Sequence, residues 1–411
     1  MNQESGIRHP FVDVPRPVWL LGWASLFTDA ATEMIYPLLP VYLSRVLGAG
    51  ATSLGVIEGI AEGVNSLLKI VSGRLSDRWS RRKPIIIGGY ALSSAARPFI
   101  ALTTSWVQVL VIRVLDRTGK GIRGAPRDAM LAEIAGSTMR GRVFGFHRAM
   151  DHAGAVIGPI IATLFLLAMP GQYRLLFGLT AIPGALAVWI LFRVPDPRGT
   201  GHVSAAEISD GPGPSRQPPA ANLPGRFYGL LGILLLFSLA NSADAFLLLR
   251  LSQALGEDAY LPLLWSLLHI VKASLSLYGG ALSDRVGRKA VIVAGWSVYA
   301  LVYLGFALST SASALVAWFL IYGIYFGLAE GTEKALVADL ASSTRRGTAF
   351  GFYNAALGAG TLLASVLFGV LYDRFGPATA FGTGVGLAVA AVALLLTLPV
   401  RPVGGADREV S

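Results

Sequence analysis

The sequence predicts an all-α membrane protein with twelve transmembrane helices, arranged as two pseudo-symmetric six-helix bundles. Three observations predict this fold class. The 411 residues are 54% hydrophobic and only 14% charged, which is far more apolar than a soluble domain. Apolar runs of about 20 residues, long enough to cross a bilayer as a helix, recur throughout the chain. A basic turn that begins with glycine occurs twice, at 73–83 and 280–289, which indicates a duplicated unit.

The apolar runs fall into two sets of six, separated by a polar segment. Residues 196–225 are rich in Pro, Gly, Ser and Asp, so they cannot bury enough apolar surface to fold, and we expect a cytoplasmic linker there. The N-terminal bundle is expected over 1–195, the C-terminal bundle over 226–400 and a cytoplasmic tail over 401–411. The expected spans are 18–47, 53–72, 84–104, 106–126, 143–168 and 173–193, then 227–255, 259–280, 290–309, 312–340, 348–371 and 377–399.

The basic residues predict the orientation of the chain. Lys and Arg gather on alternate loops, for example at 74–83 and 285–289, and the positive-inside rule puts these loops and both termini in the cytoplasm. We expect a multi-pass protein of the bacterial inner (plasma) membrane. The net charge of +10 follows from this placement and not from a nucleic-acid partner. Since the first span carries Asp29 and Glu33, it does not read as a cleaved signal peptide.

A polar corner is duplicated as well as the basic turns. Residues 138–146 and 344–352 share the pattern Thr-x-Arg-Gly-x-x-Phe-Gly-Phe, which chance similarity between apolar helices would not preserve. Parallel repeats of this kind meet around a central site near the bilayer midplane in many transporters. The duplication therefore points to a transport function.

The two basic turns resemble the loop signature of the major facilitator superfamily, G-x-L-x-D-R-x-G-R-R/K, although Ser80 stands where the first copy should have glycine. The resemblance covers almost the whole chain apart from the termini and the linker. It implies the fold of that family, alternating access, and turns that latch the cytoplasmic side in the outward-facing state. The alternative is a loop that only orients the chain. The signature residues are Gly73, Asp77, Arg78 and Arg81, then Gly280, Asp284, Arg285 and Arg288.

Small residues in the fifth span resemble the antiporter motif of the exporter branch of the family, which contains the drug:proton antiporters. The residues concerned are Gly145, Gly154, Gly158 and Pro159. Glycines at this spacing let helices approach closely, and proline permits a bend. The resemblance implies export, and the alternative is ordinary packing of small residues.

Charged residues at bilayer depth are costly and are therefore functional candidates. Asp29 and Glu33 lie four residues apart on one helix face, where a desolvated carboxylate can take up and release a proton. The alternative is that one of them is a permanent partner of an arginine. Glu58 and Glu62 have the same spacing but lie nearer the outer end, where solvated rim residues are also found.

The fourth span carries a basic stripe, which we define as Arg113, Asp116, Arg117, Lys120 and Arg127. These residues recur mostly at steps of three and four, so they share one helix face. Such a face must line water, pair with acids or bind an anion. We expect it to hold substrate charge, with salt bridges to Asp29, Glu33 or Asp151 as the alternative.

The second half offers further polar candidates for the cavity and for a gate. Glu333 and Lys334 stand where the first half has Arg127 and Asp128, and this reversal of sign would allow bridges between the halves. The cavity candidates are Asn241, Asp244, His269, Tyr325, Tyr353 and Asn354.

The remaining motifs argue against other classes of function. The sequence contains no GxxxxGK[ST] loop, no HExxH spacing and no clear G-x-S-x-G elbow, so ATP-driven transport and enzymatic activity have no support. No metal or other cofactor is expected apart from the proton gradient. We predict a monomeric, proton-coupled transporter that exports a small amphipathic or anionic organic molecule. The rival hypotheses are an organic-anion/proton symporter for uptake and a membrane sensor without transport.

Overall fold

A computed structural model describes residues 14–78, 82–135, 139–195, 223–341 and 346–399, and these residues form helices joined by short connections. The N-terminal half contains α1 (Arg16–Ile35), η1 (Tyr36–Leu38), α2 (Leu39–Val41), η2 (Tyr42–Val46), α3 (Ala51–Arg78), α4 (Lys83–Ala96), η3 (Arg97–Leu102), α5 (Trp106–Ala135), α6 (Arg140–Ala168), α7 (Tyr173–Leu179) and α8 (Ala181–Phe192). The C-terminal half contains α9 (Gly225–Ala240), α10 (Ala245–Leu255), η4 (Asp258–Tyr260), α11 (Leu261–Val286), α12 (Arg288–Leu308), α13 (Ala312–Leu340) and α14 (Arg346–Thr397).

Proline and glycine explain where the longest apolar runs bend. Pro37 and Pro40 divide the first span into α1, η1 and α2, because proline cannot donate the helical hydrogen bond. Gly376 has a φ of 83° and precedes Pro377, so α14 folds back on itself and supplies two passes. In the described residues, eight helices are long and apolar enough to cross a membrane. The arrangement agrees with the predicted all-α fold of twelve passes.

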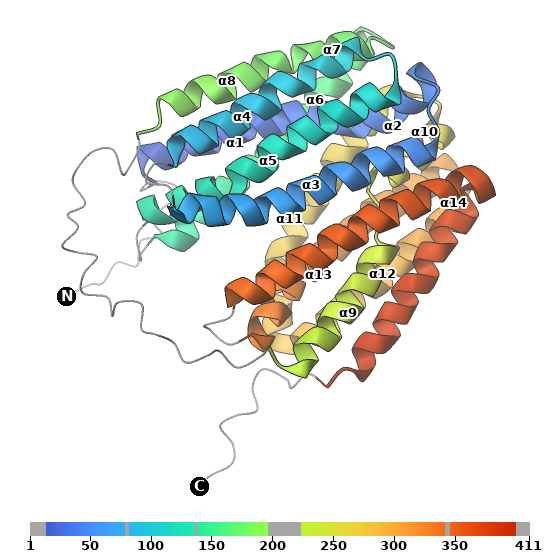
Figure 1. The fold of residues 1–411 in the computed structure, drawn as a ribbon. Coiled ribbons are helices and arrows are strands. Elements are labelled where there is room, and N and C mark those ends of the chain that lie inside the picture. The colour runs from blue at the N-terminus through green and yellow to red at the C-terminus, as the bar shows by residue number, and fades with distance from the viewer. Residues whose placement is uncertain (1–13, 79–81, 136–138, 196–222, 342–345, 400–411) are drawn as a thin grey trace, which may run out of the picture.

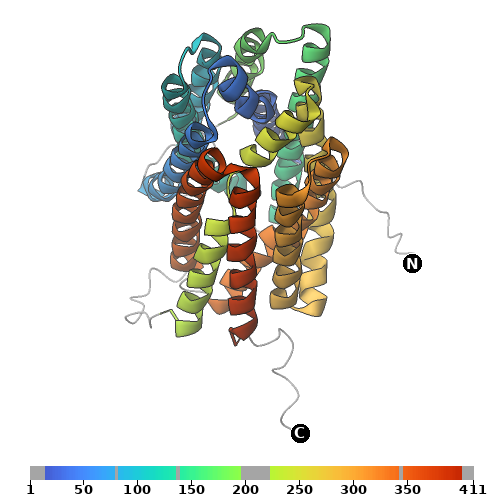
Figure 2. The same cartoon turned by 90° about the vertical axis from the view of Figure 1, so that its right-hand side faces the viewer.

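The helices form two bundles that meet at one end and diverge at the other (Figure 1). The bundles converge where α2 lies beside α10, and we call this the far end. They separate where α1 and α9 begin and α8 ends, and we call this the linker end. The view turned by 90° again shows the blue-to-green and yellow-to-red helices as two groups (Figure 2). The predicted linker at 196–225 falls almost wholly outside the described residues.

Matching contacts in the two bundles reflect the duplicated sequence. Arg82 pairs with Glu133 at 2.9 Å in the first bundle, and Arg288 pairs with Asp339 at 3.3 Å in the second. Lys83 donates to the carbonyl oxygen of Phe192 at the end of α8. Lys289 does the same at the end of α14, where it donates to the carbonyl oxygens of Leu396 and Leu398. Basic side chains at helix C-termini also interact favourably with the helix dipole.

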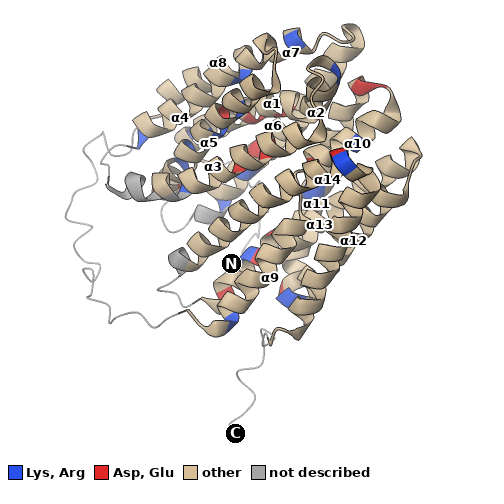
Figure 3. Cartoon of the chain, turned by 45° about the vertical axis from the view of Figure 1, so that its right-hand side comes forward, with Lys and Arg blue, Asp and Glu red and all other residues tan. Residues whose placement is uncertain are grey.

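The interiors of the two bundles differ in chemistry. Charged residues fall on α1, α3 and α5 of the first bundle (Figure 3), and Arg113 of α5 pairs with Glu58 of α3 in its interior. The second bundle is filled by aromatic rings, with Phe237 stacked on Trp296 at 4.1 Å and Tyr299 stacked on Tyr303 at 4.2 Å. The bundles therefore share a topology, while the ionic groups are concentrated in the first one.

Candidate functional site

A cavity of about 250 Å³ lies at mid-depth between the two bundles. Both halves contribute to its wall, and the lining includes charged and aromatic side chains. The lining residues are Glu33, Tyr36, Glu58, Glu62 and Arg117 from the first half, and Asn241, Ser242, Ala243, Asp244, Trp265, His269, Phe326 and Thr361 from the second.

Most of the basic stripe is neutralised by acids next to the cavity. Arg113 is 3% exposed and donates to Glu58 at 2.6 Å, with Asp116 at 3.7 Å on its other side. Asp116 also accepts from Arg97 at 2.8 Å. Arg117, which lines the cavity, has a looser contact of 4.0 Å with Glu62. Buried charges persist when they are paired in this way, so the alternative of internal salt bridges describes this part of the stripe, with other partners than those expected.

Two carboxylates of the cavity have neutral hydrogen-bond donors as their direct partners. Trp265 Nε1 donates to Glu33 Oε2 at 2.7 Å, which joins α11 of the second half to α1 of the first. Tyr322 Oη donates to Asp244 Oδ1 at 2.8 Å. Among the described residues, neither carboxylate has a cationic nitrogen within 4.0 Å. Glu33 and Asp244 therefore have no direct ion pair, and the cations that act on them, Lys120 and Arg117 for Glu33 and Lys272 for Asp244, do so from a longer distance.

His269 lines the cavity without a hydrogen-bond partner among the described residues on either ring nitrogen. Its ring lies edge-on to Trp265 with the centroids 4.9 Å apart. One turn further along α11, the ammonium of Lys272 lies 3.3 Å from the ring centroid of Phe326. A cation over an aromatic face is attracted by the ring quadrupole, so this wall combines apolar surface with free hydrogen-bonding groups.

Of the other cavity candidates of the second half, Asn241 lines the cavity, whereas Tyr325, Tyr353 and Asn354 do not. Asn241 lines the cavity and donates to Tyr325 Oη at 3.1 Å, so Tyr325 supports it from behind. Tyr353 is buried and donates to Glu333 at 3.3 Å. Asn354 is exposed and donates to the carbonyl oxygen of Phe350 on its own helix. The structure thus places Asn241 at the cavity but not Tyr353 or Asn354.

A second polar cluster lies in the first bundle, on the linker side of the cavity. Asp29 interacts electrostatically with Lys120, Arg123, Arg127 and Asp151. Ser25 donates to Asp151 and accepts from Arg127 at 3.3 Å. Arg123 lies over the ring of Tyr90 at 4.0 Å. We call Asp29, Lys120, Arg123, Arg127 and Asp151 the linker-side cluster. Neither Asp29 nor Lys120 lines the described cavity.

The two halves are held together at the far end. Asp258 accepts from Arg45 and from Tyr173, each at 2.7 Å, so one acid of the second half joins two elements of the first. Asp373 of α14 accepts from the backbone N–H groups of Ala51 and Thr52 at 2.8 and 2.7 Å. An acid at this position satisfies the free donors at the start of α3. None of these residues was a candidate from the sequence.

The predicted gate residues pair within their own halves at the linker end. Asp284 is 64% exposed and contacts Arg288 of the same turn at 2.5 Å. Arg127 pairs with Asp128, Lys334 pairs with Glu330, and Glu333 accepts from Trp296 at 2.8 Å. Among the described residues, Arg127, Glu333 and Lys334 therefore form no bridge between the halves. Gly280 faces open space. Gly73, Asp77 and Arg78 belong to the last turns of α3, but their surroundings are not among the described features. Arg81 lies outside the described residues.

The glycines of the antiporter-like motif have different surroundings. A Cβ added at Gly154 or Gly158 would collide with the backbone carbonyl of Leu26 or Ala30 on α1. A Cβ added at Gly145 would meet nothing within 4 Å. Pro159 lies inside α6. Gly154 and Gly158 therefore let α6 pack directly on α1, whereas Gly145 has no such role here.

Comparison with known proteins agrees with this arrangement. The Major Facilitator Superfamily model matches residues 21–271 and 263–410. An uncharacterized MFS-type transporter of Methanocaldococcus jannaschii is 34% identical over 393 residues, which cover 93% of this chain and 95% of that protein.

Two more distant matches are, by name, a multidrug resistance protein and a nucleoside transporter. The multidrug resistance protein MdtH of Aeromonas hydrophila is 24% identical over 361 residues, covering 86% of this chain and 87% of that protein. The crystal structure of the nucleoside transporter NupG superposes with a TM-score of 0.74 at 15% identity, covering 93% of this chain and 99% of that one. At that identity the likeness concerns the fold alone. Because the family model matches nearly the whole chain and a relative at 34% identity spans it, this protein belongs to the major facilitator superfamily and is a multi-pass membrane transporter, not an enzyme.

Proposed function

We propose that the chain is a proton-coupled exporter that moves a small amphipathic organic molecule out of the cell by alternating access. The observation that carries the proposal is the mid-depth cavity in which Glu33 and Asp244 have neutral donors as direct partners. An acid without a direct ion pair at bilayer depth is costly. It is retained where it binds a proton or a cationic group during the cycle.

In this proposal the linker end faces the cytoplasm. The basic side chains that begin or follow the spans lie at that end, among them Arg16, Lys83, Arg193, Arg226 and Lys289. Segments rich in Lys and Arg stay on the cytoplasmic side of a membrane. Asp258 and Asp373 hold the halves together at the far end, so the proposed orientation makes this conformation inward-facing.

The charge of the cavity favours a substrate with a cationic or hydrogen-bond-donating group. Arg113 of the basic stripe is already held in an ion pair with Glu58, so it offers no free positive charge to an anion. Tyr36, Trp265 and Phe326 supply aromatic wall for an apolar ring or chain. This charge balance favours the amphipathic substrate over the anionic one, both of which the sequence left open.

Glu33 couples proton binding to the movement of the halves in this proposal. Its hydrogen bond from Trp265 crosses between the bundles at 2.7 Å. A hydrogen bond to an ionised carboxylate is roughly twice as strong as one between neutral groups. In the outward-facing state Glu33 takes up a proton, which lowers the cost of burying this carboxyl group when the far end closes. After the proton leaves toward the cytoplasm, the ionised Glu33 forms the strong bond with Trp265, and substrate loaded from the cytoplasm then allows the far end to open.

Asp29 has a second role in the same cycle. It lies in the linker-side cluster, where Lys120, Arg123 and Arg127 surround it electrostatically. A carboxylate among basic groups between the cavity and the linker end is suited to pass a proton from Glu33 to the cytoplasm. Asp29 therefore acts as the exit site, and Glu33 acts as the coupling site.

The runner-up function is uptake of an organic anion with protons. It is favoured by the loose contact of 4.0 Å between Arg117 and Glu62, whose side chain is 39% exposed. If Glu62 swings away, the guanidinium of Arg117 faces the cavity and binds a carboxylate or phosphate in bidentate fashion.

Proton movement in liposomes tests the proposal. The purified protein is reconstituted in vesicles that contain a pH-sensitive dye, after thermal shift measurements have identified binders in a panel of amphipathic cations, neutral drugs and organic anions. We expect amphipathic cations to drive proton movement. Glu33→Gln should abolish gradient-driven transport but keep substrate exchange, because the amide still accepts from Trp265 without binding a proton.

The matched control is Glu257→Gln, which makes the same change at an exposed position of the far end and should transport normally. The coupling assignment is wrong if gradient-driven transport persists in both Glu33→Gln and Asp29→Asn. Proton movement driven by anions alone would favour the symporter. Binding without flux of any compound would indicate a sensor.

A further inference from the structure

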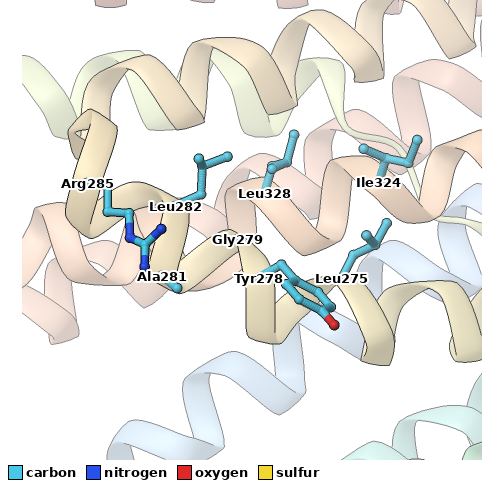
Figure 4. Close-up of a pocket in the computed structure, with 8 residues that line it drawn as sticks. All are labelled: Leu275, Tyr278, Gly279, Ala281, Leu282, Arg285, Ile324 and Leu328. Carbon is cyan, nitrogen blue, oxygen red and sulfur yellow. The ribbon is translucent and has the colours of Figure 1, made fainter.

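A second cavity, of about 450 Å³, opens between α11 and α13 near the linker end. Its wall is apolar apart from one arginine at its edge (Figure 4). We propose that this groove binds an anionic phospholipid, with an acyl chain against the apolar wall and the phosphate on Arg285. The lining residues are Leu275, Tyr278, Gly279, Ala281, Leu282, Arg285, Ile324 and Leu328.

The groove faces the membrane and is separate from the transport cavity. Phe326 lines the central cavity, whereas Ile324 and Leu328, two residues to either side, line the groove. Residues two apart on an α-helix point in nearly opposite directions, since each residue turns the helix by about 100°. Tyr278 is 72% exposed and Leu282 is 44% exposed. In a spanning protein such exposed apolar side chains contact lipid.

The sequence builds the depth of the groove with glycine. A Cβ added at Gly279 would overlap the carbonyl group of Gly327 on α13, so the two helices touch at this point. Small residues allow such close approach between membrane helices. Tyr278 and Leu282 on α11 and Leu328 on α13 then rise on both sides of the contact (Figure 4). These side chains border a groove in which a lipid acyl chain can lie.

Arg285 supplies a free positive charge at the depth of the lipid headgroups. It lies in the last turn of α11, and the apolar span of this helix ends at Val286. The neighbouring acids Asp284 and Asp339 are both engaged by Arg288. Arg285 itself forms no ion pair with another described residue, and its side chain lies beside Ala281 at the groove (Figure 4). A guanidinium between an apolar groove and water is suited to hold a phosphate.

Lipid binding to the purified, full-length protein in detergent tests this site. We expect phosphatidylglycerol to raise the midpoint of thermal unfolding more than phosphatidylcholine does. Glycerol phosphate, which has the headgroup charge without acyl chains, should have no effect. Native mass spectrometry should detect a bound phosphatidylglycerol. Arg285→Gln should weaken its binding roughly fivefold, because one basic residue near the membrane surface contributes about that factor.

Two further variants make the test specific. Leu328→Trp fills the groove and should remove the preference for phosphatidylglycerol while leaving Arg285 in place. Arg374→Gln is the matched control. It removes an exposed arginine at the far end of the protein, beside the kink of α14, and the variant should bind phosphatidylglycerol like the wild type. Equal stabilisation by the two lipids, or a preference unchanged in both Arg285→Gln and Leu328→Trp, would overturn the proposal. The proposal rests on membrane placement and not on the transported substrate, so it can fail or succeed independently of the export assay.

Discussion

Glu33 and Glu58 show that the partner of a buried carboxylate decides its role. Both residues line the cavity. Glu58 is 6% exposed and bound to Arg113, so it is not the solvated rim residue that the sequence allowed. Glu33 meets an indole N–H from the other half of the protein. Spacing of three and four residues predicts a shared helix face, but it does not identify a partner on another helix.

Two residues of the site, Arg97 and Trp265, were not predicted from the sequence, for different reasons. Arg97 lies inside an expected span and binds Asp116. An arginine at bilayer depth indicates a functional or paired residue, but Arg97 belongs to no stripe of charged residues on its helix. Trp265 gave no signal, because tryptophan is common at membrane interfaces and its role depends on the position of Glu33. The sequence therefore predicts which ionic groups matter better than it predicts the neutral groups that bind them.

Trp265→Phe tests the link between the halves. Phenylalanine keeps ring contacts with Tyr36 and His269, which lie 5.0 and 4.9 Å from the Trp265 ring, but removes the N–H donor. We expect the state closed at the far end to lose about 1.5–3 kcal/mol relative to the open state, the usual range for a hydrogen bond to a charged group.

Spin labels measure this shift directly. The chain contains no cysteine, so Leu102→Cys and Leu308→Cys provide the sole labelling sites, both exposed at the far end and on different halves. The distance distribution should move toward longer values in Trp265→Phe and should stay unchanged in Trp23→Phe, a control at a partly exposed indole. Identical distributions in all three proteins would contradict the role given to Trp265.

At the scale of the helices, hydropathy predicted the membrane-crossing parts and missed the ends. The helices α3, α5 and α11 continue to Arg78, Ala135 and Val286, beyond the expected spans. A helix does not end where the bilayer ends, because charged residues with good helix propensity extend it into water. The break between α9 and α10, which brings Asn241 and Asp244 to the cavity, contains no proline and was not predicted.

Packing of α6 on α1 gives a prediction that concerns whole helices. Gly154→Ala should destabilise the protein by about 1–3 kcal/mol, because the added methyl group would press on the Leu26 carbonyl and overpacking costs of this size are typical. Gly145→Ala belongs to the same motif and should be neutral or slightly stabilising, since nothing lies within 4 Å and alanine favours the helix. Thermal unfolding in detergent distinguishes the two variants, and equal midpoints would show that the α1–α6 contact is not tight.

For the whole molecule, the duplication predicted the architecture but not the conformational state. The paired contacts of Arg82 with Glu133 and of Arg288 with Asp339 occur within single bundles, so they persist whichever end is open. The state depends instead on contacts between bundles, such as those of Asp258 and Asp373. These residues lie in short connections or at helix ends, where no periodic pattern marks them. One sequence encodes both states, and the balance between them rests on a few such contacts.

Asp258→Asn tests whether the far end is the gate that this balance controls. The acid is 8% exposed and accepts from Arg45 and Tyr173, so the neutral amide loses the ionic part of one contact and the charge-assisted part of the other. We expect the closed state to be weakened by about 1–3 kcal/mol. The labels at 102 and 308 should then report longer distances without any change of pH, while Glu257→Gln next to it should behave like the wild type. In the transport assay, the same variant should leak substrate or protons, because a far end that opens without bound substrate no longer couples the two movements. A variant with unchanged distances and tight coupling would mean that Asp258 only anchors a loop and that the gate lies elsewhere.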